Sequence, residues 1–309
     1  WPETRTILAS TGSEAVEAAL KTAQVVTGHP GILAFEGSYH GLTLGALATT
    51  SRSHFREPFE ERLYPGVVFA PFPDPLRQGA EAAARSLERV EELLARGTPD
   101  GDRIGAVLVE PVQGRAGARV APDGFMARLS ALARDAGALV IADEVFTGMG
   151  RCGEVLAACA GASPIMDGWP VSRGEAIHTS TFLGHPAACA AGLAVLEAME
   201  MEGTAARVRL LGGRLATELR SRLADAPGVA EVRGLGLLLG IEMATGEALT
   251  PAAGMGAQVA EAALALGVLV LPAGEEGHVV ELAPPVDLTD EQVECAVDVL
   301  AQAVRGAVG

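Results

Sequence analysis

The clearest pattern in the chain is a short apolar run, residues 137–142, that ends abruptly at Asp143 and Glu144. Its length and β-branched residues predict a strand buried on both faces. Residues 123–136 before it have apolar positions at helical spacing, and a second apolar run, residues 104–109, ends in Glu110. Strand, helix and strand in this order predict a βαβ unit with two parallel neighbouring strands.

Parallel strands end at one edge of their sheet, so Glu110 and Asp143 are expected at the same edge. In open α/β sheets this edge is where ligands bind. A single carboxylate at a strand end often does no more than cap the following helix, but two on one edge favour a site.

Similar patterns extend over the whole chain. Before residue 205 we expect strands at 6–10, 31–35 and 67–70, with helices at 14–26, 77–96 and 186–202. After it we expect a helix at 205–223, strands at 229–233, 237–242, 268–271 and 279–282, and helices at 255–266 and 289–304. The chain is therefore predicted to form an α/β domain over 1–204 and a smaller α+β domain over 205–309.

Two loops at predicted strand ends carry further candidates for a site. Thr11 and Glu14 have the spacing of a capping box, which places Gly12 and Ser13 at a helix start. Free backbone N–H groups there suit a phosphate, although the motif also serves as a plain helix cap. The loop at 36–41 carries Tyr39 and His40, which either belong to a site or only pack the loop.

Composition excludes several classes of function. The formal charge is −16 and no basic run is present, which argues against nucleic acid as a partner. The four cysteines lack the spacing of a metal site, so no bound metal is expected. We expect them to be free thiols in a protein of the cytoplasm. The chain contains no apolar stretch of about 18 residues, so a membrane partner is not expected. The only lysine, Lys21, is expected to be solvated on the first helix.

Five segments together carry a family resemblance, and they follow one another in the family's order: 10–17, 37–41, 110–114, 142–148 and 178–182. They resemble the class III pyridoxal-phosphate-dependent aminotransferases, of the ornithine, acetylornithine and 4-aminobutyrate type. This resemblance implies PLP fold type I, which has a doubly wound, mostly parallel sheet in the large domain and a smaller α+β C-terminal domain. It also implies amino-group transfer from an amino acid or amine to an α-keto acid, with pyridoxal 5'-phosphate as cofactor.

The resemblance assigns roles to the candidate residues. Asp143 would pair with the ring nitrogen and favour the cationic ring, and Glu110 would lie on the substrate side. Ser180 and Thr181 would reach the phosphate of a neighbouring subunit, which implies a homodimer with the site at the interface. The remaining cofactor-binding residues implied are Gly12 and Ser13 at the phosphate, Tyr39 and Val145 on the two faces of the ring, and His40.

Two positions depart from the family pattern. Phe146 stands where many relatives carry a glutamine that contacts the cofactor's phenolic oxygen. Glu281 stands where family members that act on α-amino acids often carry a carboxylate-binding arginine. A carboxylate does not bind a carboxylate, so the donor is expected to be an amine or an ω-amino acid, or to enter with its amine end first.

The family's Schiff-base lysine has no counterpart in this chain. The resemblance places it between Arg151 and His178, an interval that is too short here by a few dozen residues. We expect that a mobile active-site segment and an N-terminal segment before Trp1 are missing from the sequence, with a chain break within 151–166. The alternative is a true deletion that leaves an inactive protein.

Three other functions are consistent with parts of the pattern. Residues 139–144 also resemble the Walker B strand of a P-loop NTPase, but the chain contains no GxxxxGK[ST] segment. A PLP-dependent racemase of the same fold would share every cofactor residue. A non-catalytic protein of this fold would explain the missing lysine.

Overall fold

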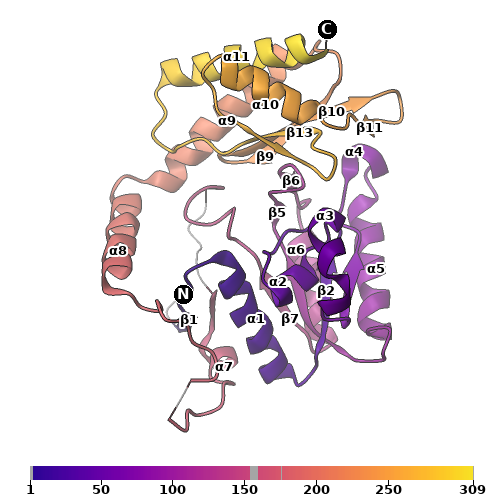
Figure 1. Cartoon of the computed structure of the whole chain (residues 1–309), viewed down its shortest axis with the longest axis vertical. Helices are drawn as coiled ribbons and strands as arrows, with labels where there is room; N and C mark the ends of the chain where they lie inside the picture. The colour runs from indigo at the N-terminus through magenta and orange to yellow at the C-terminus, as the bar shows by residue number, and fades with distance from the viewer. Residues whose placement is uncertain (1–2, 154–158, 175, 309) are drawn as a thin grey trace.

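The computed structural model of the chain describes residues 3–153, 159–174 and 176–308 (Figure 1). Its central element is a parallel sheet with the strand order β3-β2-β4-β7. The strands are β2 (Gly31–Phe35), β3 (Val67–Ala70), β4 (Ile104–Val109) and β7 (Leu139–Ala142). Strands β4 and β7 are parallel neighbours that pair from Ala106 with Leu139 to Val109 with Ala142, which confirms the predicted βαβ unit. The predicted burial of β7 on both faces is wrong, because this strand ends the sheet order and its residues are partly buried or exposed.

Helices cover both faces of this sheet. Val107 and Val109 of β4 pack into a core with Leu87 and Leu129, which belong to α5 (Ala82–Arg96) and α6 (Phe125–Asp135). Leu108 points to the other face, where α1 (Gly12–Thr27) and α2 (Leu44–Thr49) pack. Because β4 is buried along its whole length, it needs apolar side chains on both faces. The doubly wound α/β arrangement is thereby confirmed.

The rest of this part consists of short elements. They are β1 (Thr4–Ile7), α3 (Ser53–Arg56), the 3-10 helix η1 (Glu57–Arg62), α4 (Pro75–Gln78), β5 (Val112–Gln113), β6 (Arg119–Val120), β8 (Cys159–Ala162) and α7 (Ser163–Met166). Strands β1 and β8 pair antiparallel, as do β5 and β6.

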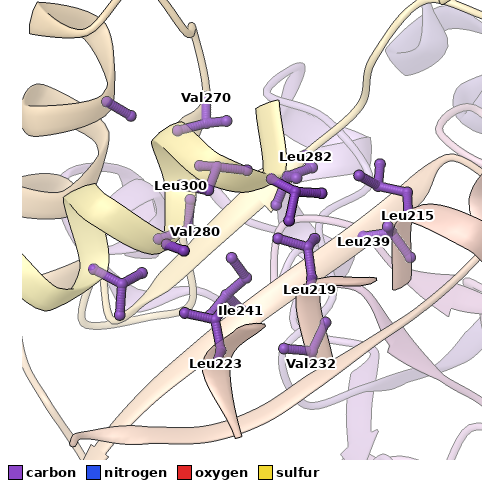
Figure 2. Close-up of a cluster of buried hydrophobic side chains, with 14 of the residues drawn as sticks. Leu215, Leu219, Leu223, Val232, Leu239, Ile241, Val270, Val280, Leu282 and Leu300 are labelled. Atoms are coloured by element: carbon purple, nitrogen blue, oxygen red, sulfur yellow. The ribbon is translucent and has the colours of Figure 1, made fainter. Parts of the chain in front are cut away.

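The C-terminal part has its own antiparallel sheet and core. Strand β10 (Leu238–Thr245) pairs with β9 (Val229–Leu235), β11 (Thr250–Pro251) and β13 (Val279–Leu282), and β12 (Leu271–Ala273) extends the sheet. Helices α9 (Thr204–Leu223), α10 (Met255–Ala265) and α11 (Asp290–Val308) pack on it. Figure 2 shows the apolar side chains of this core, among them Leu219, Ile241 and Leu300.

Helix α8 (Pro186–Met201) leads into α9 and stands apart from the other helices in Figure 1. It begins at Pro186, as predicted, and none of its side chains is buried. The buried core residues of the C-terminal part begin at Val208, which is consistent with a boundary near residue 204. The division at this residue stays a prediction. No helix in the described part of the chain has the length and apolar character needed to cross a membrane.

Three details differ from the expected elements. The helix expected over 77–96 is divided into α4 and α5, because Gly79 has φ +73°, which ends α4. The strand expected at 268–271 lies at Leu271–Ala273, and the one expected at 6–10 lies at Thr4–Ile7. The chain break expected within 151–166 falls in part on residues 154–158, which lie outside the described residues.

Candidate active site

The two strand-end carboxylates do meet at one edge of the parallel sheet. Asp143 lies directly after β7, and its backbone N–H donates to the carbonyl of Val109 at 2.8 Å, one residue before Glu110. The Glu110 carboxylate accepts from the backbone N–H of Tyr39 at 3.1 Å and from that of Gly114 at 3.3 Å. Burial, together with the charge of Asp143, raises the pKa of Glu110 well above its usual range.

Asp143 is held in place by His40. The two side chains are buried, and His40 Nδ1 lies 2.7 Å from Asp143 Oδ2. The other carboxylate oxygen, Oδ1, accepts from the backbone N–H of Val145 at 3.1 Å. His40 is held in turn by its backbone N–H, which donates to Thr50 Oγ1 at 2.9 Å. The imidazole therefore fixes the orientation of the carboxylate, in the same way that hydrogen-bond partners orient the side chains that bind a metal ion.

The predicted start of the first helix is confirmed. Thr11 caps α1 by accepting from the backbone N–H of Glu14 at 3.2 Å, and Glu14 accepts from the backbone N–H of Ser10 at 2.7 Å. Gly12 and Ser13 therefore occupy the first helical positions, where backbone N–H groups have no partner within the helix.

Close approaches at two glycines bring the three segments together. A Cβ atom on Gly12 would lie 3.0 Å from Val145 Cγ1, and one on Gly41 would lie 2.1 Å from Ser13 Oγ. Gly41 also has φ +119°, a conformation that favours glycine. The helix start, the loop of Tyr39 and His40, and the end of β7 thus pack closely against one another and form one cradle.

The aromatic and apolar candidates border this cradle. Tyr39 is half-buried and packs edge-on against Phe55, with ring centroids 5.5 Å apart. Val145 is 59% exposed, so its side chain is free to contact a ligand. Phe146 packs close to Gly114, because a Cβ atom there would lie 3.1 Å from Phe146 Cγ.

The structure places Ser180 beside the helix start of its own chain. Its hydroxyl donates to Glu14 Oε1 at 3.4 Å, and Thr181 is exposed. The expected contact of both residues with a second subunit stays a prediction. Lys21 is exposed on α1, as predicted, and its Nζ lies 3.3 Å from His178 Nδ1. No cluster of metal-ligating side chains occurs among the described residues.

Three residues near the site did not emerge from the sequence. Glu17 accepts from Thr43 Oγ1 at 2.8 Å and from the backbone N–H of Gly45 at 3.1 Å, and so fixes the loop that follows His40. Arg52 is buried, and Arg115 pairs with Glu281 at 3.5 Å. Arg115 directly follows the segment that ends at Gly114, so its place in the chain could have identified it. The partners of Glu17 and Arg52 are too distant in sequence to give any signal.

Comparison with known proteins identifies the family. The model of the family "Aminotransferase class-III" matches residues 1–166 and 155–304. A 4-aminobutyrate aminotransferase of Mycobacterium leprae is 33% identical over 97% of this chain and 73% of its own length. A 5-aminovalerate aminotransferase of Pseudomonas putida is 36% identical over 93% of this chain and 71% of its own. The crystal structure of a PLP-bound amine transaminase from an uncultivated Pseudomonas species superposes with a TM-score of 0.87, at 28% identity over 99% of this chain and 77% of the other.

The same comparisons locate a difference inside the chain. The alignment with the Mycobacterium leprae relative extends over 332 positions, more than the 309 residues of this chain. That relative therefore has residues within the matched region that are missing here. The family match is divided into two stretches that overlap at 155–166, within the interval that the sequence pattern marked as too short.

The residues of the cradle fit the family's cofactor, pyridoxal 5'-phosphate. The start of α1 offers backbone N–H groups for the phosphate, and the fixed Asp143 carboxylate would favour a protonated ring nitrogen. His40 Nε2 is buried without a partner in the described part of the chain. When bound, this cofactor supplies an electron sink for the carbon that loses or gains the amino group. The chain belongs to the class III aminotransferases, the pyridoxal-phosphate-dependent enzymes that transfer an amino group between an amino donor and a keto acid.

Proposed function

We propose that the amino donor of this protein is an ω-amino acid and that the acceptor is an α-keto acid. The observation that carries this proposal is Glu281, which is buried in β13. The family resemblance places it where α-amino-acid enzymes often carry a carboxylate-binding arginine. The relatives named for 4-aminobutyrate and 5-aminovalerate support an ω-amino donor. In this proposal Gly12, Ser13, Tyr39, His40, Asp143 and Val145 bind the cofactor, and Glu110 faces the substrate.

Donor preference tests this proposal. The cofactor-loaded protein should bind 5-aminovalerate more tightly than L-alanine in calorimetry, and Glu281→Arg should shift the preference towards L-alanine. An unchanged preference in the variant would mean that Glu281 does not face the site.

We further propose that this 309-residue chain binds its cofactor without a covalent link. Lys21 is the only lysine, and it lies beside His178 on the exposed side of α1. Absorbance titration should detect bound pyridoxal phosphate. Borohydride treatment followed by intact-mass measurement should detect no pyridoxyl adduct. An adduct at Lys21 would contradict the proposal.

We also propose a homodimer with the site at its interface. Helix α8 has no buried side chain, and its exposed residues include Leu193 and Leu196. An apolar helix of this kind needs a partner surface, and the neighbouring loop carries Ser180 and Thr181. Leu193→Glu should shift sedimentation towards the monomer, whereas Leu264→Glu, at the equally exposed end of α10, should not. A stable monomer that binds cofactor normally would exclude this assembly.

The proposed compartment is the cytoplasm. All four cysteines are unpaired, which agrees with a reducing environment. Fractionation of cells that produce the protein, with thiol labelling of each fraction, tests this assignment.

A further inference from the structure

A pair of arginines lies next to the candidate active site without any role in the cofactor cradle. Arg115 follows Gly114, whose backbone N–H donates to Glu110. The guanidinium carbon of Arg52 lies 5.4 Å from the ring centroid of Phe55, and Phe55 in turn packs against Tyr39. Both arginines therefore border the loop and the carboxylate that form the substrate side of the site.

The Gly274 turn holds the two arginines together. Arg52 Nη2 donates to the carbonyl of Gly274 at 2.9 Å, and the backbone N–H of Gly274 donates to the carbonyl of Arg115 at 3.0 Å. Gly274 has φ +79°, and a Cβ atom there would lie 2.6 Å from the His278 ring. Segments distant in sequence thus place two guanidinium-bearing residues at a fixed position.

The hydrogen bonding of Arg52 is incomplete. Its side chain is buried, with 9% of the residue exposed, yet Nε and Nη1 have no partner in the described part of the chain. A buried donor without an acceptor destabilises the protein, and more so when it is charged. Burial and the charge of Arg115 lower the pKa of Arg52. An incoming anion would remove this penalty.

Glu281 is a weak counter-ion for this pair. It contacts Arg115 at 3.5 Å, the limit for a hydrogen bond, and it is also close enough to Arg52 to be influenced by its charge. Burial raises the pKa of Glu281 in spite of both arginines. The buried Glu281 thus faces two guanidinium groups, and the exposed Glu275 also acts on Arg52.

We propose that Arg52 and Arg115 form the subsite that binds the substrate's carboxylate, and that Glu281 occupies it as counter-ion in the unliganded protein. This inference rests on the proposed ω-amino donor and names the residues that recognise it. The forked geometry of arginine suits a carboxylate, which accepts two parallel N–H bonds.

The test measures binding of ligands that lack an amine and therefore do not react with the cofactor. Calorimetry compares pentanoate, which has the length of a five-carbon ω-amino acid, with its neutral amide, pentanamide. Pyruvate is tested in parallel. The ligand whose affinity depends on the two arginines shows whether the subsite binds the carboxylate of the donor or that of the keto acid. Pyridoxal phosphate binding is measured by absorbance in the same samples.

The wild-type protein should bind at least one of the two carboxylates about tenfold or more tightly than pentanamide. Arg115→Gln and Arg52→Gln should each remove most of this preference, and Glu281→Gln should increase it. Arg89→Gln, at a half-buried arginine on α5 that is outside the site, is the matched control and should change nothing. Arg52→Lys retains the charge and serves as a second variant if the buried Arg52→Gln protein unfolds.

Equal affinity for pentanoate, pyruvate and pentanamide in a sample that binds pyridoxal phosphate would overturn the subsite and leave the family function intact. Unchanged carboxylate binding in Arg115→Gln would overturn it as well. Loss of pyridoxal phosphate binding in the wild-type protein would instead contradict the cofactor site itself.

Discussion

Among single side chains, the pairing of Asp143 with His40 connects the sequence most directly to chemistry. Asp143 could be identified because it ends an apolar strand, and the structure adds that His40 fixes its orientation at 2.7 Å. Both side chains are buried, so neither is screened by water and the loss of one leaves the other unpaired.

Asp143→Asn and His40→Gln should each weaken pyridoxal phosphate binding, and their effects should not add, because both remove the same interaction. A hydrogen bond to a charged group contributes roughly 1.5–3 kcal/mol, so each variant should lose about tenfold or more in affinity. Absorbance titration of the single and double variants measures the coupling. Fully additive losses would show that the two residues act independently.

Glu110 should make stability depend on pH. Burial and Asp143 raise its pKa in the folded protein, so its protonated form is favoured by folding. The resulting stabilisation is fully present below the unfolded value of about 4.3 and is lost as the pH rises through the folded value. Glu110→Gln should therefore gain stability relative to the wild type between pH 5 and pH 8 in urea unfolding. A difference that is constant with pH would contradict the raised pKa.

At the level of elements, helix α9 shows how neighbouring positions acquire opposite requirements. Gly212 and Gly213 are adjacent in the same helix, but only Gly212 faces the turn at Gly236. A Cβ atom on Gly212 would lie 2.0 Å from the carbonyl oxygen of Gly236. Apart from the backbone of α9 and the residues next to Gly213, no atom of the described chain lies within 4 Å of a Cβ atom on Gly213.

Gly213→Ala should therefore stabilise the protein by about 0.5–1 kcal/mol, because alanine loses less backbone entropy than glycine in a helix. Gly212→Ala should destabilise it by roughly 1–3 kcal/mol, because α9 has to move away from the turn. Urea unfolding of the two variants provides the comparison. Equal effects would mean that α9 does not pack against Gly236 as described.

At the scale of the whole molecule, a buried ionic network joins the parallel-sheet part to the C-terminal sheet. Glu242 of β10 is fully buried and pairs with Arg77 of α4 and with Arg233 of β9. Arg233 also donates to the carbonyl of Gly117 at 2.8 Å, and Arg77 donates to that of Leu249 at 3.2 Å. The two parts are thus held in one orientation by bonds that involve side chains of both.

Glu242→Gln should cost about 3–5 kcal/mol, because the buried Arg233 and the partly buried Arg77 both lose a fully buried counter-ion. Burial opposes ionisation, but Arg233 and Arg77 lower the pKa of Glu242 overall. The stabilisation is thus present above the unfolded value of about 4.3 and is lost as the pH falls through the folded value. In urea unfolding, the difference in the free energy of unfolding between Glu242→Gln and the wild type should be smaller at pH 4 than at pH 7. Glu231→Gln, at a partly exposed partner of Arg233, is the control and should cost less than about 1 kcal/mol.

The sequence by itself determined the features that depend on local pattern. The apolar runs of 104–109 and 139–142 identified two parallel strands. The run in β4 is apolar because that strand is buried on both faces, whereas β7, at the end of the strand order, is only partly buried. The capping pair Thr11 and Glu14 fixed the start of α1, since its hydrogen bonds join residues three or four apart. Two strand-end carboxylates and five segments in order were sufficient to identify the family.

Only the tertiary structure decided which distant side chains meet. His40 reaches Asp143 across more than a hundred residues, and Arg52 meets Gly274 across more than two hundred. No periodicity encodes such contacts, because they depend on how the loops close over the sheet edge and not on the spacing of neighbours. The same reason explains why Glu281 could be identified in the sequence, while its pairing with Arg115 beside Glu110 required the folded chain.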